Sequence, residues 1–440
     1  MQRLADPNLF KTIKELFVLS FPIIIGQLGQ MLIGAGDVYI ASLHSTTAVA
    51  SIGVANGFIN PIFLFGIGLM MGVSPILAIK LGKGEDMRSS LKSIMVYSAI
   101  AGIVLSLITT VFGREIVGLI GIKEELVESV YFYMSVVAWS FPFALAFQAG
   151  KEYLQAFEEV VVPNLMALGA VALNLVLNYF LVFGVGGIEG MGEKGLAVAS
   201  LLIRVILCAS LLLYLSREKW GKLSFHFIKE MFRFGRPVAL MFFMEVLAFC
   251  AVSVLSGKLG ILEAATNNII MTLSAITFMI PLSISSAVAV KVGTGYGARD
   301  FSMVDLSSKA ALFISLMFTC FSAATFYLFP AAIMSLTTAD EKVVQLGIKL
   351  LFIVALFQIV DGLQVTFAGI LRGVEKTMSV SIMVFIGYWL FGIPMGIYLS
   401  FFSDMGVMGL WVGLASSLAV LATALAIYTY TVRIKLQRKF

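Results

Sequence analysis

The chain has 440 residues, of which 60% are hydrophobic and only 12% are charged, and its formal net charge is +5. The mean hydropathy is +1.01. This composition excludes a water-soluble globular protein and indicates an integral membrane protein. Because apolar stretches of about 20–25 residues recur along the sequence, we expect an all-α fold rather than a β-barrel.

Twelve membrane-spanning helices are predicted from these apolar stretches. The second and the eighth are long enough to tilt or to extend beyond the bilayer. The predicted spans cover residues 16–40, 48–79, 92–112, 129–150, 161–184, 195–216, 237–259, 264–290, 308–330, 344–370, 378–402 and 406–430.

The basic residues predict how the chain is oriented. The two tails and every second connection carry most of the 30 lysines and arginines. Because cytoplasmic loops are enriched in these residues, we expect a multi-pass protein of the cell (inner or plasma) membrane with both termini in the cytoplasm. The longest basic connection, 216–236, is expected to contact anionic lipids and not nucleic acid.

The two halves of the chain resemble each other. Ala78–Gly84 (AIKLGKG) recurs as Ala289–Gly295 (AVKVGTG), and Pro22 at the first span has a counterpart in Pro237 at the seventh. Since each half holds six spans, the repeats share one orientation, which predicts a pseudo-two-fold axis along the membrane normal. We therefore expect a monomer with an N-lobe (1–216), a cytoplasmic linker (217–236) and a C-lobe (237–440), and a substrate site between the lobes.

Three acids lie inside apolar stretches with no basic residue near them in sequence: Asp37, Glu245 and Asp361. A carboxylate at bilayer depth costs about 2.5–3.5 kcal/mol even on the gentler insertion scales. Each acid must therefore be protonated, bound to an ion or placed at a wet cavity. This pattern predicts an ion or substrate pathway, although Asp37 lies near the outer end of its span and is equally consistent with a boundary acid.

Polar residues at helical spacing are the candidate partners of these acids. Asn174 and Asn178 share one helix face. Their amide oxygens are suited to complete an oxygen cage with Asp37 around a hard cation. The alternatives are hydrogen bonds to a protonated Asp37, or contacts that merely hold helices together. Ser200, in the sixth predicted span, is a weaker candidate for the same site.

The tenth predicted span carries a polar stripe, because Gln358 and Gln364 flank Asp361 on an otherwise apolar helix. A bound Na⁺ is possible at Glu245 and Asp361 or at Asp37. Arg204, in the middle of the sixth predicted span, either pairs with an acid or extends to an interface. The sequence does not decide between these roles for Arg204.

Motifs for ATP hydrolysis and for nucleophilic catalysis are absent from the sequence. We therefore expect a transporter and not an enzyme, with no cofactor and with Na⁺ or H⁺ as the coupling ion. The abundant phenylalanines (36) and methionines (22) mostly serve packing, but they also suit a pocket for flat apolar cations. The expected partners are small organic cations and membrane lipids.

A series of short motifs occurs in order along both halves of the chain: Phe21-Pro22, Gly36-Asp37, Leu173–Tyr179, Pro237 with Glu245, Phe278–Pro281, Gln358–Asp361 with Gln364, Leu371–Gly373 and Tyr388-Trp389. In these motifs the chain resembles the multidrug and toxic compound extrusion (MATE) family, in the NorM-like branch. The resemblance covers essentially the whole chain and implies a Na⁺- or H⁺-coupled antiporter that exports organic cations by alternating access.

The resemblance also implies roles for the polar residues. Asp37 with Asn174 and Asn178 matches an N-lobe cation or proton site, and Glu245 with Asp361 matches a C-lobe cation site. NorM-like proteins tend to carry tyrosine one turn before the tenth-span acid, where this chain has Phe357. A hydroxyl ligand is thereby lost from the C-lobe site, while an aromatic face remains.

Three other transporter classes remain as alternatives. A major-facilitator transporter also has two parallel six-span halves, but the segment Leu81–Arg88 fits its loop motif poorly. A lipid-linked precursor flippase of a related fold would need a basic cavity, for which Arg204 is the one candidate among mostly acidic buried charges. A channel is the weakest alternative, because nothing in the sequence resembles a filter loop.

Overall fold

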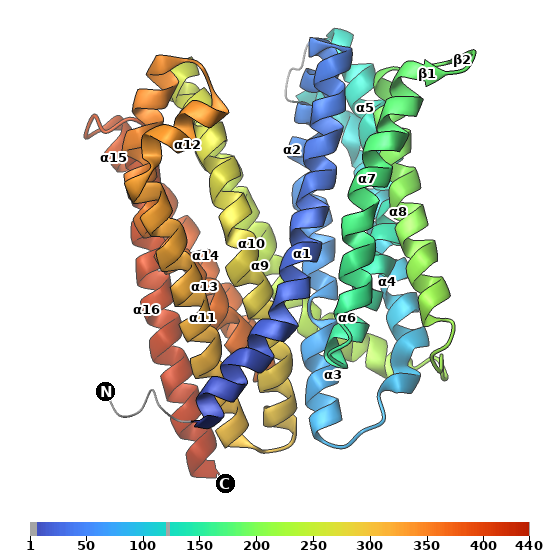
Figure 1. Ribbon diagram of the computed structural model, residues 1–440, viewed down its shortest axis with the longest axis vertical. Coiled ribbons are helices and arrows are strands. Elements are labelled where there is room, and N and C mark those ends of the chain that lie inside the picture. Colours follow the sequence, from blue (N-terminus) through green and yellow to red (C-terminus); the bar gives the residue numbers. More distant parts are fainter. Residues whose placement is uncertain (1–6, 120–123, 440) are drawn as a thin grey trace. The chain divides into compact units, whose positions relative to one another are not determined.

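The computed structural model describes residues 7–119 and 124–439, and these residues are almost entirely helical (Figure 1). Within this part of the chain, twelve helical segments are long and apolar enough to cross a membrane, which confirms the expected number of spans. The extended exception is a short hairpin of β1 (Gly184–Val185) and β2 (Ile188–Glu189), which connects two of the helices. The all-α membrane fold expected from composition is therefore confirmed.

Contacts within the chain group into two compact units, which we call the N-terminal and the C-terminal unit. The N-terminal unit holds Pro22–Leu77 and Glu85–Ala239. The C-terminal unit holds the described residues of the first segment up to Phe21, together with Ala78–Gly84 and the chain from Leu240 onward. The lobe boundaries expected at the 217–236 linker stay a prediction.

The N-terminal unit is built from helices that run through most of the first half of the chain. They comprise α1 (Pro7–His44) from Pro22 onward, α2 (Thr46–Met70), α3 (Val73–Gly82) up to Leu77, a 3₁₀ turn (Arg88–Ser90), α4 (Leu91–Leu119), α5 (Glu124–Ala138), α6 (Phe141–Ala156), α7 (Val161–Phe183), α8 (Glu193–Leu215) and the first turns of α9 (Phe225–Leu259).

The fourth span is broken into α5 and α6, where the sequence predicts one helix over 129–150. The turn at Trp139 and Ser140 precedes Pro142. Proline lacks an N–H group and its ring clashes with the carbonyl four residues earlier, which is that of Ala138, the last residue of α5. The proline therefore ends the first helix and begins the second, and it leaves Ser140 at the break.

Glycines let α1 and α7 approach each other closely in the N-terminal unit. A Cβ atom on Gly29 would lie 3.2 Å from the carbonyl oxygen of Ala167, and one on Gly36 would lie 3.1 Å from the amide oxygen of Asn174. Small residues at such crossings allow helices to pack at short range in a membrane. The crossing places Asp37, the residue after Gly36, against the face of α7 that carries Asn174 and Asn178.

The C-terminal unit is organised around α13 (Glu341–Gly373), which packs against α10 (Ile261–Gly297), α11 (Phe301–Leu328) and α16 (Val407–Lys439). Figure 1 shows these long helices beside one another in yellow to red. The unit also holds the part of α9 from Leu240 onward, the described part of α1 up to Phe21 and the end of α3 from Ala78. Its remaining helices are α12 (Pro330–Thr337), α14 (Thr377–Phe385), η3 (Ile386–Gly392) and α15 (Ile393–Phe401).

The eleventh span contains a wide π-helical turn, η3, between α14 and α15. Pro394 follows it at the start of α15 and prevents regular helix bonds there. The hydroxyl of Ser417 donates to the carbonyl oxygen of Gly387 at 2.7 Å, so a backbone acceptor freed by the turn is satisfied inside the bilayer. The turn changes the direction of Tyr388 and Trp389, and π-helical turns are frequent at functional sites.

Several helices are longer than the apolar stretches predict. The first begins at Pro7 instead of residue 16, and α9 begins at Phe225, inside the stretch expected as a linker. The early turns of α9 bury Phe227, Met231 and Phe234. The helices continue past their apolar residues because the backbone of the polar residues at their ends also forms helical hydrogen bonds. Hydropathy reports only on side chains and does not detect these extra turns.

Candidate functional site

Asp37 is the centre of a buried polar cluster in the N-terminal unit. The side-chain amides of Asn174 and Asn178 donate to its Oδ1 atom at 3.0 and 2.7 Å, and the Ser200 hydroxyl donates to Oδ2 at 2.9 Å. Asp37 is 7% exposed, and both asparagines are fully buried. The structure thus brings together the four residues expected there and buries the carboxyl group among helices, about two turns before α1 ends at His44.

The two asparagines serve Asp37 as donors in this arrangement. Three donors on one carboxylate stabilise its charged form. The amide of Asn178 also donates to Oδ1 of Asn174 at 3.2 Å, and the Oδ1 atom of Asn178 has no hydrogen-bond partner among the described residues. That buried oxygen, with the carboxylate beside it, is suited to receive a proton donor or a hard cation.

Two further residues belong to the surroundings of Asp37. Tyr133 of α5 is buried, and its phenol interacts with the Ser200 hydroxyl and with the charge of Asp37. Arg204 lies one turn after Ser200 on α8 and also interacts electrostatically with Asp37. The sequence offered no signal for Tyr133, and the position of Arg204 relative to Asp37 depends on how α1 and α8 pack.

Glu245 and Asp361 form a second acidic site, in the C-terminal unit. Both are buried, and their charges interact with each other across α9 and α13. The Tyr388 hydroxyl donates to Oε1 of Glu245 at 3.4 Å. Oδ1 of Asp361 has no hydrogen-bond partner within the described residues. Two interacting carboxyl groups repel when both are charged, so a proton or a cation at this site would relieve their repulsion.

The two glutamines beside Asp361 are buried on α13, as expected for a polar stripe. Oε1 of Gln358 accepts a short hydrogen bond from the Ser322 hydroxyl, while its amide nitrogen has no partner in the described residues. Oε1 of Gln364 is likewise without a partner there. The stripe therefore presents both donors and acceptors near Asp361.

Phe357 lies in an aromatic cluster that closes one side of the acidic site. Its ring meets the rings of Trp411 and Phe249 edge to face, at centroid distances of 5.3 and 6.3 Å. The Trp411 indole donates to Oδ1 of Asn267 at 3.0 Å. A hydroxyl reaches the acidic site from a different helix, because Tyr388 of the π-helical turn donates to Glu245.

A small cavity opens beside Asp361. Its volume is about 10 Å³, close to the minimum that holds one water-sized particle. Oxygen-bearing side chains dominate its polar lining, which is the ligand type that hard cations select. The lining comprises Ser274, Thr277, Phe278, Ile280, Pro281, Phe318, Thr319, Ser322, Gln358 and Asp361.

Two adjacent buried charges of opposite sign lie at the end of α6, beyond the predicted span. The predicted fourth span ends at 150, but α6 continues to Ala156 and buries Lys151 and Glu152. Glu152 accepts from the Gln148 amide at 2.9 Å and, in a short hydrogen bond, from the Ser74 hydroxyl. The Lys151 ammonium has no hydrogen-bond partner among the described residues but interacts with the charge of Glu152.

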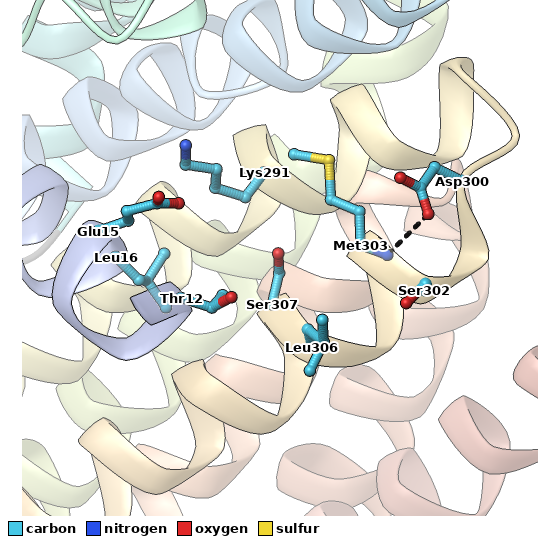
Figure 2. A pocket seen from close by; sticks show the side chains of 9 residues that line it. All are labelled: Thr12, Glu15, Leu16, Lys291, Asp300, Ser302, Met303, Leu306 and Ser307. Atoms are coloured by element: carbon cyan, nitrogen blue, oxygen red, sulfur yellow. Dashed lines mark hydrogen bonds between the residues drawn. The ribbon is translucent and has the colours of Figure 1, made fainter. Parts of the chain in front are cut away.

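A larger pocket of about 190 Å³ lies elsewhere in the C-terminal unit (Figure 2). It mixes charges of both signs, since Glu15 of α1 and Lys291 of α10 line it together with Asp300. The Asp300 carboxylate accepts from the backbone N–H of Met303 at 3.0 Å and caps α11. This pocket holds none of the residues expected in the ion sites.

Comparison with known proteins gives consistent matches. A family model described as MatE matches residues 22–180 and again 237–398. The multidrug resistance protein NorM of Aliivibrio fischeri is 29% identical over 436 residues, which is 94% of each chain. The NorM protein of Photobacterium profundum is 28% identical over 442 residues, with 95% of each chain covered.

Solved structures share the fold. The Vibrio cholerae MATE transporter VcmN in its bent form has a TM-score of 0.89 at 16% sequence identity, and the match covers 99% of this chain and 100% of that one. A eukaryotic MATE transporter, AtDTX14, has a TM-score of 0.88 at 21% identity, with 98% and 99% covered. The family model thus matches both halves of the chain, and the solved structures match its fold over nearly the full length.

Proposed function

The chain belongs to the MatE family of multidrug efflux transporters, and from this membership we propose that it is a secondary antiporter which exports amphipathic organic cations in exchange for Na⁺ or H⁺. It is a multi-pass membrane protein and a transporter, not an enzyme. We further propose that it works as a monomer in the cell membrane, with both termini in the cytoplasm.

The observation that carries this proposal is the acidic pair Glu245 and Asp361. Both carboxyl groups are buried in the C-terminal unit, and a cavity for one water-sized particle lies against Asp361. Burial of two acids without a bonded cation is costly in a membrane. A proton or a Na⁺ would relieve that cost, so the charge of the site changes with its occupant. This dependence is what ion coupling requires.

The Asp37 cluster supports a second ion-sensitive position. Its carboxylate accepts from three side chains that come from α7 and α8. A bound proton or cation would change the geometry of these bonds and hence the packing of α1 on the two helices. We propose that Asp37 responds to the coupling ion in the N-terminal unit, by a mechanism of alternating access.

The energies are adequate for such exchange. One inward monovalent cation releases about 2.3 kcal/mol per 100 mV of membrane potential. A tenfold concentration gradient adds about 1.4 kcal/mol. Exchange for one monovalent organic cation cancels the electrical term, so strong accumulation would need a second ion or a steeper chemical gradient.

Dye efflux from proteoliposomes tests the proposal. An organic cation such as ethidium is loaded, and Na⁺ and H⁺ gradients are imposed separately, each with and without a membrane potential. We expect one gradient to drive efflux and Asp361→Asn to abolish the response to it. Asp305→Asn is the matched control, because this partly exposed acid of the same unit pairs with Lys309 and Arg433.

Efflux that ignores both gradients would overturn the antiporter proposal. It would favour the flippase alternative, which predicts movement of a lipid-linked pyrophosphate instead of an organic cation. The buried basic residues Lys151 and Arg372 do not favour that alternative. The charge of Lys151 is offset by that of the neighbouring Glu152, and Arg372 donates to the Ser285 hydroxyl at 2.7 Å inside the C-terminal unit.

A further inference from the structure

Arg204 is held close to the Asp37 site without pairing with Asp37. It lies on α8 at position i+4 from Ser200, so the two side chains share a helix face, with Cβ atoms about 5–6 Å apart. Ser200 bonds directly to Asp37, and Arg204 interacts with the same carboxylate through its charge. No hydrogen bond or ion pair joins Arg204 to Asp37 in the described part of the chain.

Two other contacts fix the guanidinium. Its Nη1 atom donates to the Ser140 hydroxyl at 2.6 Å, at the break between α5 and α6. Its Cζ atom lies 4.6 Å from the centre of the Phe63 ring on α2, in cation–π geometry. These contacts hold the guanidinium on α2 and at the α5–α6 break, while the two oxygens of Asp37 accept from Asn174, Asn178 and Ser200.

The other charged groups around Asp37 lie toward the end of the unit and have contacts of their own. Neither α2 nor α7 carries a charged side chain. On α1, the ring of His44 packs on Phe183. At the start of α8, Glu193 accepts from Ser129, and the Lys194 ammonium lies 5.3 Å from the ring centre of Phe132. Tyr133 of α5 is the titratable group nearest to both Asp37 and Arg204.

We propose that Arg204 is a resident counter-cation of the Asp37 site, which balances the empty carboxylate and competes by its charge with the cation that binds there. The inference rests on the proposed function, because it takes Asp37 as a position for the coupling ion. With Arg204 nearby, a monovalent cation on Asp37 leaves the site with an excess positive charge. The cation is therefore held weakly and released readily.

The size of the effect follows from Coulomb's law. For two unit charges about 7 Å apart in an effective dielectric constant of about 20–40, the interaction is about 1.2–2.4 kcal/mol, which corresponds to a roughly ten- to fiftyfold change in the affinity for a monovalent cation. Removal of the Arg204 charge should raise the affinity by that factor. Removal of its hydrogen-bond partner should not, because the charge remains in place.

The test compares three variants of the full chain: R204Q removes the charge, R204K keeps it, and S140A removes the hydrogen-bond partner of the guanidinium. Two quantities are measured. One is the concentration of the coupling cation that gives half-maximal dye efflux, and the other is the concentration that gives half-maximal thermal stabilisation of the purified protein.

We expect R204Q to lower both concentrations roughly ten- to fiftyfold, while R204K and S140A stay within about threefold of the wild type. Unchanged values in R204Q would overturn the inference. Equal shifts in all three variants would also overturn it, since they would indicate a purely structural role.

If R204Q is too unstable to purify, the inference predicts that D37N restores its stability, because the uncompensated carboxylate is then gone. Failure of D37N to do so would count against it.

Failure of the inference can be separated from failure of the proposed function. If the wild type shows cation-dependent efflux and stabilisation that R204Q leaves unaltered, the antiporter proposal stands and the role of Arg204 falls. If the wild type and D37N both transport without regard to either cation, the proposed function falls and the inference falls with it.

Discussion

The Tyr388 hydroxyl lies 3.4 Å from Oε1 of Glu245 and joins a π-helical turn to the acidic pair of the C-terminal unit. This turn, η3, contacts α9 at a second point, because the neighbouring Trp389 indole donates to the carbonyl oxygen of Met244 at 3.1 Å. Two successive aromatic residues thus fix η3 against the helix that carries Glu245. The contact provides a hydroxyl where Phe357 provides none.

Tyr388→Phe should weaken the response to the coupling ion without loss of the fold. A hydrogen bond to a charged group contributes about 1.5–3 kcal/mol, and the length of this one places it at the lower end. We expect the half-maximal ion concentration for dye efflux to rise about tenfold. Tyr398→Phe is the control, because Tyr398 is exposed and stacks on Phe402. An equal effect of both substitutions would contradict the role of Tyr388.

Phe357→Tyr should partly reverse the effect of Tyr388→Phe. Phe357 lies one turn before Asp361 on α13, and a hydroxyl added there is the one that the NorM-like pattern places beside the acid. Its ring is buried against Trp411, so the added atom costs about 1–3 kcal/mol of stability. Efflux and thermal melting of the double variant measure the two effects separately. No recovery of ion affinity in a folded double variant would show that the site does not use a hydroxyl from position 357.

Much of the fold could be predicted from the sequence, because hydropathy reports directly on the bilayer. The twelve spans are confirmed, and the structure brings Asn174 and Asn178 to Asp37 as their helical spacing suggests. Tyr388 belongs to one of the sequence motifs, but its contact with Glu245 depends on the π-helical turn. Such a turn has no clear periodic signal. The ends of the spans were missed for a different reason, because helices continue where hydropathy stops.

The buried charges show where sequence reasoning stops. Lys151 and Glu152 follow the apolar stretch and read as loop residues, but α6 extends past them and neighbouring helices cover them. Arg204 was left without a role because its neighbours come from α2 and from the α5–α6 break, which are distant in sequence. Burial of a charged residue depends on these tertiary contacts, which spacing along one helix does not reveal.

Asn178→Ala should impair the N-terminal site more than Asn174→Ala does. Asn178 makes the shorter bond to Asp37, at 2.7 Å, and it also donates to Asn174. Loss of a buried partner of a charged group costs about 1–3 kcal/mol, which corresponds to a roughly five- to 150-fold change in the half-maximal ion concentration. Asn268→Ala, at an exposed position of α10, is the control. A larger effect of Asn174→Ala would contradict this order.

Glu152→Gln and Lys151→Met should each lower the melting temperature, and the double variant should lower it less than the sum. Removal of one charge leaves the other buried without compensation, which costs about 3–5 kcal/mol in a directly bonded pair and less for two charges that interact without a hydrogen bond. Glu128→Gln on α5 is the control, since Glu128 is exposed. Additive losses in the double variant would show that the two charges do not stabilise each other.

Gly369→Ala should disturb the helix that carries Asp361 from a distance of two turns. A Cβ atom at Gly369 would lie 2.4 Å from the carbonyl oxygen of Ser285, so α13 would have to move away from α10. We expect a loss of about 1–3 kcal/mol in stability, together with a weaker ion response because Asp361 moves relative to α10.

Gly257→Ala is the matched control, because a Cβ atom there meets no atom within 4 Å. The added helix propensity should stabilise α9 by up to about 1 kcal/mol. Thermal melting and ion-dependent efflux of both variants check this prediction. A stable Gly369→Ala protein with normal ion affinity would show that the close α10–α13 crossing does not set the geometry of the acidic pair.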